Sequence, residues 1–228
     1  MPVAESLGRV MDRVRAAAVR ARRRPDEVTL IGISKTMPVE RIREAVRAGL
    51  THLGENKVQE AASKIPDLAV APAELTWHLV GHLQSNKAGK AAELFDCIHS
   101  VDSEKVAVAL GRHAVRIGKV RAILIQVDLG GEPTKSGVEP TEVRKVIDLA
   151  ARTDGVKVLG LMTIPPASAE PQASRPWFER LRRLRDDLAG PGLELRELSM
   201  GMTNDFEVAI EEGATMVRVG RAIFGDRV

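Results

Sequence analysis

The sequence predicts an α/β fold, a single closed (β/α)8 TIM barrel with one extra helix at its amino terminus. Eight short apolar segments alternate with helical segments, and predicted helices repeatedly end at a glycine, as at Gly49, Gly155 and Gly213. Eight such units fit a chain of 228 residues. No linker-like segment divides the sequence, so we expect one domain over residues 1–228.

The predicted elements follow one another in a regular order. An amphipathic helix over residues 4–23 comes first, because Leu7, Val10 and Val14 recur at helical spacing. The strands are apolar runs suited to burial on both faces; they span residues 28–35, 51–55, 75–81, 97–101, 122–129, 158–164, 197–200 and 216–219. The helices between them span residues 38–48, 57–64, 85–95, 103–116, 140–152, 177–188 and 205–212. The segment after the last strand is too short for a covering helix, so we expect the amino-terminal helix to fill that gap.

Composition argues against several classes of protein. The net charge of +3 is too small to indicate a nucleic-acid partner, and no aromatic residues are interleaved with the basic ones. No apolar run is long enough to cross a bilayer, and residues 1–6 lack the apolar core of a signal peptide. The lone Cys97 lies in an apolar run and is expected to be a buried thiol. We therefore expect a cytoplasmic protein with no membrane partner.

Lys35 is the first candidate functional residue. It stands at the carboxyl end of the first predicted strand, the end at which α/β folds bind their ligands. A lysine amine that is partly desolvated among apolar neighbours can condense with an aldehyde. Taken alone, this stretch fits a lysine that simply extends to solvent at least as well.

Two loops favour an anion site. The segment 199–205 follows the seventh strand, and its Ser199, Gly201 and Thr203 combine hydroxyl groups with a tight turn before a helix. Gly220 and Arg221 leave the eighth strand, and loops after strands seven and eight are the usual phosphate site of this barrel. Each loop alone also fits ordinary turn and cap chemistry. Together they predict phosphate binding.

Arg218 shares one face of the eighth strand with Met216 and Gly220, which points it into the barrel. A buried arginine needs an anionic or hydrogen-bonding partner, and a carboxylate such as Glu55 is the alternative to a ligand. His78 and His82 are four residues apart on a strand, roughly 13 Å, which is too far for one metal. We find no zinc spacing, Walker loop or nucleophile elbow, and we assign no catalytic residue.

Six motifs, taken together, resemble the pyridoxal phosphate homeostasis proteins (the YggS/PROSC family), whose fold is like the barrel domain of alanine racemase. The resemblance covers nearly the whole chain in the same order. The family often has serine where Thr203 stands, which keeps a hydroxyl. The motifs are GISK (32–35), LGENKVQE (53–60), WHLVGHLQSNK (77–87), GLMTI (160–164), LSMGMTND (198–205) and RVGRAIFG (218–225).

The resemblance implies a site for pyridoxal 5'-phosphate (PLP). Lys35 would hold the cofactor as an aldimine, with Asn56 near the ring, Arg218 facing the pyridine nitrogen and Lys135 near the site. The phosphate would be held by Ser199, Gly201, Thr203, Gly220 and Arg221. The implied partners are PLP and PLP-dependent apoenzymes that receive it, and the implied state is a monomer.

The same resemblance implies a protein that regulates the intracellular PLP and vitamin B6 pool without catalytic turnover. A cation beside the pyridine nitrogen keeps that nitrogen unprotonated, so the ring is a weak electron sink. A racemase of this fold compensates with a tyrosine and a second domain, whereas we expect no second domain here and the sequence has no tyrosine. The alternative is a PLP-dependent amino-acid racemase or lyase that uses Lys35 and Lys135 as bases. A more distant alternative is a phosphate-sugar enzyme that does not use PLP.

Overall fold

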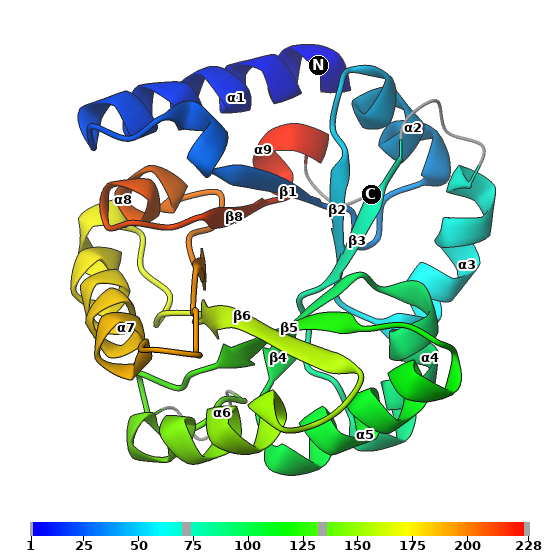
Figure 1. The fold of residues 1–228 in the computed structure, drawn as a ribbon. Helices are drawn as coiled ribbons and strands as arrows, with labels where there is room; N and C mark the ends of the chain where they lie inside the picture. Colours follow the sequence, from blue (N-terminus) through cyan, green and yellow to red (C-terminus); the bar gives the residue numbers. More distant parts are fainter. Residues whose placement is uncertain (1, 70–73, 132–135, 226–228) are drawn as a thin grey trace.

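The fold is a closed eight-stranded parallel barrel surrounded by helices, which confirms the predicted class (Figure 1). The computed structural model describes residues 2–69, 74–131 and 136–225. Neighbouring strands pair in sequence order, and β1 closes the barrel by pairing with β8. The strands are β1 (Thr29–Ile33), β2 (His52–Glu55), β3 (Thr76–Leu79), β4 (Cys97–Val101), β5 (Arg121–Gln126), β6 (Val156–Met162), β7 (Glu197–Ser199) and β8 (Met216–Val219).

The helices cover the outside of this barrel. Each turns an apolar stripe towards the strands, and the main core fills the space between the two layers. A smaller apolar cluster lies inside the barrel and comprises Ile31, Cys97, Leu124, Met162 and Met216. The helices are α1 (Val3–Arg20), α2 (Val39–Arg47), α3 (Val58–Leu68), α4 (Ala88–Leu94), α5 (Glu104–Arg116), α6 (Val143–Ala151), α7 (Arg175–Leu188), α8 (Phe206–Glu211) and α9 (Arg221–Phe224), with short 3-10 turns at Pro25–Glu27, Ser85–Lys87, Pro140–Glu142 and Pro171–Ser174.

The amino-terminal helix fills the gap at the seam of the barrel, as expected. Helix α9 is a single turn, too short to cover β8 and β1. Helix α1 contacts α2, α8 and α9 and runs along this seam (Figure 1). Its apolar stripe includes Val3, Leu7, Val10 and Val14, all of which are buried.

The first strand is shorter than the sequence indicates. It ends at Ile33, so Lys35 lies in the turn that follows and not in the strand itself. Thr36 has a positive φ of 62°, which a β-branched residue adopts only where its surroundings hold it. The chain therefore bends sharply at Lys35, immediately above the barrel.

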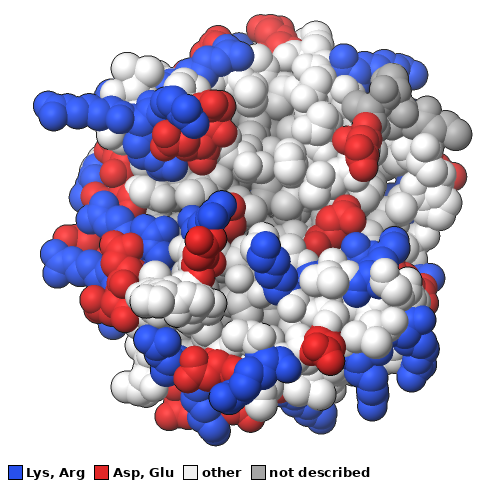
Figure 2. Space-filling view, viewed as in Figure 1, with Lys and Arg blue, Asp and Glu red and all other residues white. Residues whose placement is uncertain are grey.

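The surface is of mixed charge. Figure 2 shows positive and negative side chains interspersed over the face viewed, in keeping with the net charge of +3. Across the described part of the chain, none of the helices has the length and apolar character needed to cross a membrane.

Candidate functional site

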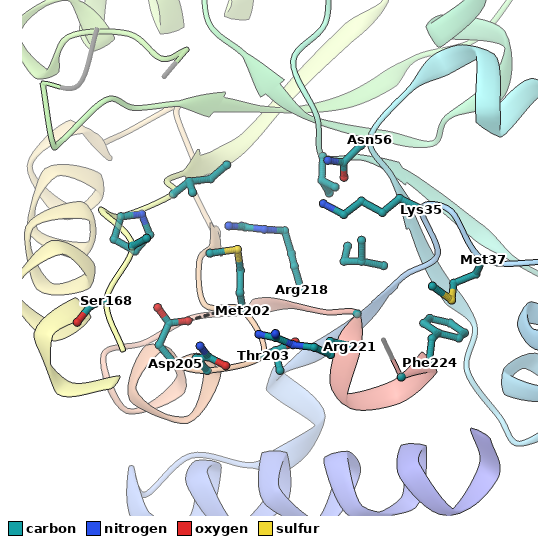
Figure 3. Close-up of a pocket in the computed structure, with 18 of the residues that line it drawn as sticks. Lys35, Met37, Asn56, Ser168, Met202, Thr203, Asp205, Arg218, Arg221 and Phe224 are labelled. Atoms are coloured by element: carbon teal, nitrogen blue, oxygen red, sulfur yellow. Dashed lines mark hydrogen bonds between the residues drawn. The ribbon is translucent and has the colours of Figure 1, made fainter. Parts of the chain in front are cut away.

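A cavity of about 780 Å³ opens at the carboxyl ends of the strands. Its lining joins Lys35 and Asn56, which follow β1 and β2, to Thr203, Arg218 and Arg221 from β8 and the loops after β7 and β8 (Figure 3). The structure thus brings together residues that are far apart in the sequence and that the sequence predicts as one site. Apolar side chains complete the lining: Ile33, Met37, Val80, Ile164, Met202 and Phe224.

The turn that carries Lys35 is fixed from below by a buried polar network. Lys64 Nζ, on α3, donates to the carbonyl oxygen of Ser34 at 2.7 Å and forms ion pairs with Glu55 at 3.0 Å and Glu60 at 2.6 Å. Ser34 Oγ donates to Glu55 Oε1 at 2.7 Å. Burial raises the pKa of Glu55, although Ser34 and Lys64 act in the opposite direction. This network ties β1, β2 and α3 together beneath the cavity.

The other side of the Lys35 turn is held by the same helix. The backbone N–H of Thr36 donates to the carboxylate of Glu60. With Ser34 and Thr36 both bonded to α3, the backbone of Lys35 is fixed on each side. The Lys35 side chain itself is partly exposed and extends across the cavity (Figure 3). A lysine held in this way can reach a ligand in the cavity.

Unsatisfied backbone donors border the cavity at the loops after β7 and β8. Within the described residues, the N–H groups of Thr203, Asn204 and Arg221, which line the cavity, have no hydrogen-bond acceptor. Thr203 and Asn204 lie in the turn before α8, and Arg221 is the first residue of α9, where a helix leaves its backbone donors unpaired. Beside them stand the Thr203 hydroxyl and the exposed Arg221 guanidinium. Such a donor set fits a phosphate group.

Gly201 shapes this donor set without lining the cavity. Its φ of +89° belongs to the left-handed region, and a Cβ there would lie 2.5 Å from Ala209 Cβ. Its carbonyl oxygen accepts the Arg218 N–H at 3.0 Å. Gly201 therefore sets the turn between β7 and α8 and joins it to β8. Gly220, in contrast, lines the cavity directly.

Arg218 enters the cavity from β8 with a buried side chain (Figure 3). Its guanidinium donates to Ser199 Oγ at 2.6 Å and to the carbonyl oxygen of Thr163 at 3.0 Å. Burial lowers the pKa of Arg218 to about 10, so it stays charged at neutral pH. The alternative partner expected for it, Glu55, is instead engaged with Lys64 and Ser34.

Ser199 is placed differently from the other predicted phosphate ligands. It is fully buried and does not line the cavity. Its Oγ accepts from Arg218 and lies 2.8 Å from His99 Nδ1. The structure thus places Ser199 beneath Arg218 rather than among the amides of the α8 and α9 turns.

Asn56 lies above β2, where its backbone meets that of Gly81. A Cβ at Gly81 would lie 2.2 Å from the Asn56 carbonyl oxygen, so only glycine permits this approach. Asn56 lines both the main cavity and a smaller adjoining one of about 250 Å³. Lys135, which the resemblance places near the site, lies outside the described residues.

Sequence reasoning missed a row of histidines in the barrel interior. His52, His78 and His99 are joined by ring contacts of 3.0 and 2.9 Å between nitrogens. His82, considered as a partner of His78, instead pairs at the surface with Asp102 at 3.1 Å. The available signal was that His78 and His99 occupy inward-facing positions of neighbouring strands.

Cys97 is buried, as expected, and burial raises its pKa. Its sulfur and the ring nitrogens of His78 and His99 lie within 4.8 Å of one another. Spacing in the sequence gave no hint of this group, because its members come from β3 and β4.

Comparisons with known proteins agree with the fold. The alanine racemase N-terminal domain family matches residues 9–228. A pyridoxal phosphate homeostasis protein of Aquifex aeolicus is 44% identical over 228 residues, which cover 100% of this chain and 99% of the relative. The structure of PipY from Synechococcus elongatus with PLP bound has a TM-score of 0.84 at 41% identity, covering 98% of this chain and 100% of PipY. An alanine racemase of Clostridium difficile, at 14% identity and a TM-score of 0.75, shares the fold over 57% of its own length.

Proposed function

Since the chain belongs to the pyridoxal phosphate homeostasis proteins, within the alanine racemase N-terminal domain family, we propose that it binds PLP through Lys35 and regulates the supply of this cofactor without catalytic turnover. One observation carries the proposal. A single cavity holds an amine, a buried guanidinium and a set of unpaired backbone donors, which match the aldehyde, ring and phosphate of PLP.

Each residue has a distinct role in this proposal. Lys35 anchors the cofactor covalently through its ε-amine, and Asn56 lies near the ring. Thr203, in the turn before α8, and Gly220 and Arg221, at the start of α9, hold the phosphate. Gly201 and Ser199 support this arrangement from beneath. The Gly201 carbonyl oxygen accepts from the Arg218 backbone N–H, and Ser199 Oγ accepts from the Arg218 guanidinium. One domain, residues 1–228, contains the whole site.

The charge of Arg218 explains why turnover is not expected. When bound, PLP supplies an aldehyde carbon that bonds to amines and a pyridine ring that accepts electron density from the substrate. A guanidinium that stays charged next to the ring nitrogen opposes protonation of that nitrogen. The sequence also has no tyrosine to act as a second acid or base. The residues present therefore favour binding of the cofactor over catalysis with it.

The proposed carrier is a cytoplasmic monomer that passes PLP to PLP-dependent apoenzymes. The name that the curated relatives share supports a role in homeostasis. The single, buried Cys97 is in keeping with a reducing compartment.

The loaded protein is expected not to turn over amino acids. Single amino acids are added in deuterated water, and exchange at the α-carbon and racemisation are followed by NMR and chiral chromatography. Exchange should remain far below about 10 s⁻¹, a typical enzyme rate. Turnover near that rate, absent from Lys35→Ala, would instead identify a racemase or lyase.

Arg221→Gln is expected to weaken PLP binding by about tenfold, because one charge-assisted hydrogen bond to the phosphate is lost. The dissociation constant is measured by titrating the cofactor-free protein with PLP and, separately, with pyridoxal, which has no phosphate. Only PLP binding should weaken. Arg116→Gln, at the exposed end of α5, is the matched control. Equal losses for PLP and pyridoxal would show that Arg221 does not contact the phosphate.

A further inference from the structure

A continuous row of polar side chains crosses the interior of the barrel. It begins at His52, the first residue of β2, and rises through His78 and His99 on the next two strands. From His99 it passes to Ser199 and ends at Arg218 in the cavity. The contacts are His52 Nδ1 to His78 Nε2 at 3.0 Å, His78 Nδ1 to His99 Nε2 at 2.9 Å, His99 Nδ1 to Ser199 Oγ at 2.8 Å and Arg218 to Ser199 Oγ at 2.6 Å.

The number of available protons fixes which group donates in each hydrogen bond of this row. Arg218 has donors only, so it must donate to Ser199 Oγ. Ser199 is fully buried, and among the described residues its one hydroxyl proton finds an acceptor only at His99 Nδ1. A neutral His99 then carries its proton on Nε2 and donates it to His78 Nδ1. By the same count His78 donates from Nε2 to His52 Nδ1, so all three rings share one tautomer.

Burial keeps these rings neutral, as the count requires. Desolvation lowers the pKa of His78 to about 3, and it places that of His99 well below its usual range. Desolvation also lowers the pKa of the half-buried His52, although nearby Asp96 opposes this shift. Arg218 is therefore the charged member of the row, and its donated hydrogen bond orients every proton away from the cavity.

We propose that His99 is a positioning residue for the cofactor site: it holds the Ser199 hydroxyl so that its oxygen accepts from Arg218, and thereby fixes the guanidinium in the cavity. The effect of His99 on PLP rests on the proposed function, whereas the proton arrangement does not. His78 and His52 extend the row and fix the tautomer of His99. His99 itself is fully buried and does not line the cavity.

The same geometry disfavours a metal ion at His78, Cys97 and His99. Although their ligand atoms lie within 4.8 Å, every ring nitrogen of the two histidines already has a hydrogen-bond partner. A metal would have to break the row. Stoichiometric binding of Co²⁺, with the visible spectrum of thiolate ligation lost in Cys97→Ala, would overturn the proposal.

The first test uses the protein labelled with ¹⁵N-histidine, with and without PLP. Long-range ¹H–¹⁵N NMR should show His52, His78 and His99 as neutral rings protonated on Nε2. Ser199→Ala should abolish the single tautomer at His99. Cys97→Ala, which alters the same interior without removing a member of the row, should leave it intact. A charged His99, or one protonated on Nδ1, would overturn the proposal whether or not PLP binds.

The second test measures how fast PLP leaves after dilution. His99→Leu should release it about tenfold faster, because the variant loses the buried hydrogen bond to Ser199, the residue that accepts from the charged Arg218. His99→Asn keeps an acceptor near the position of Nδ1 and should stay within about threefold of the wild type. If His99→Leu fails to fold, the release rate of PLP from His99→Asn tests the positioning role. Wild-type release from His99→Leu, or equal acceleration in both variants, would refute a positioning role.

Discussion

Lys35→Ala is expected to abolish the visible absorbance of the PLP-loaded protein and to leave the fold intact. The amine is the proposed covalent anchor, and its side chain extends into an open cavity, so its removal leaves no buried void (Figure 3). Absorbance spectra and circular dichroism measure the two effects. After borohydride reduction of the wild type, mass spectrometry should place the cofactor on the peptide that contains Lys35.

The matched control for this experiment is Lys57→Ala. Lys57 is an exposed lysine next to Asn56, and it does not line the cavity. Its replacement should preserve the spectrum. If Lys35→Ala still gave a reduced adduct at full occupancy, another lysine such as Lys135 would be the anchor, and the assignment of Lys35 would be wrong.

Lys64→Met is expected to lower the free energy of unfolding by about 3–5 kcal/mol at neutral pH, because breaking a buried ion pair leaves an uncompensated charge. Lys64 is the cation of the network under the Lys35 turn, where Glu55 is fully buried and Glu55 Oε2 already lacks a hydrogen-bond partner within the described structure. Urea denaturation measures the change. Lys90→Met breaks an exposed pair with Glu93 and should cost less than about 1 kcal/mol.

The loss in Lys64→Met should depend on pH. Burial already raises the pKa of Glu55, and removal of the lysine raises it further. The folded variant then holds a proton that the unfolded chain releases above its ordinary pKa, so stability falls as the pH rises through this interval. The deficit should therefore be smaller at pH 5 than at pH 8. The double variant Lys64→Met/Glu55→Gln should recover part of the loss, and a failure to recover any would contradict the buried-charge explanation.

Local pattern was sufficient to predict the barrel and most of the cavity. Parallel strands bring their carboxyl ends to one face, so the positions of Lys35, Thr203 and Arg221 follow once the strands are identified, whereas Asn56 comes only from the family resemblance. The two loops after β7 and β8 could be predicted because their glycines and polar residues have direct structural roles.

The height at which each inward-facing side chain lies in the barrel could not be predicted in the same way. Alternation along a strand tells which side chains point inward, but the stagger between strands decides which of them meet. His52, His78 and His99 lie at different heights on three strands, and their contacts follow from that stagger. For the same reason the loop sequence predicts Ser199 as a phosphate ligand, whereas its hydroxyl lies beneath Arg218. The ion pair of Glu55 with Lys64 depends on how α3 packs, which no local pattern records.

The pairing of β1 with β8 has a consequence for how the protein acquires its cofactor. Lys35 follows β1 and Arg218 belongs to β8, and Ile31 lies opposite Arg218 in the register that closes the barrel. This contact joins the two strands that are farthest apart in the sequence, so it closes the longest loop of the barrel and carries the largest loop-closure entropy. No half-barrel contains both the anchor and the guanidinium. A nascent chain therefore gains the proposed aldehyde-binding site only when the eighth strand docks, and a cofactor that binds only the closed form opposes its reopening.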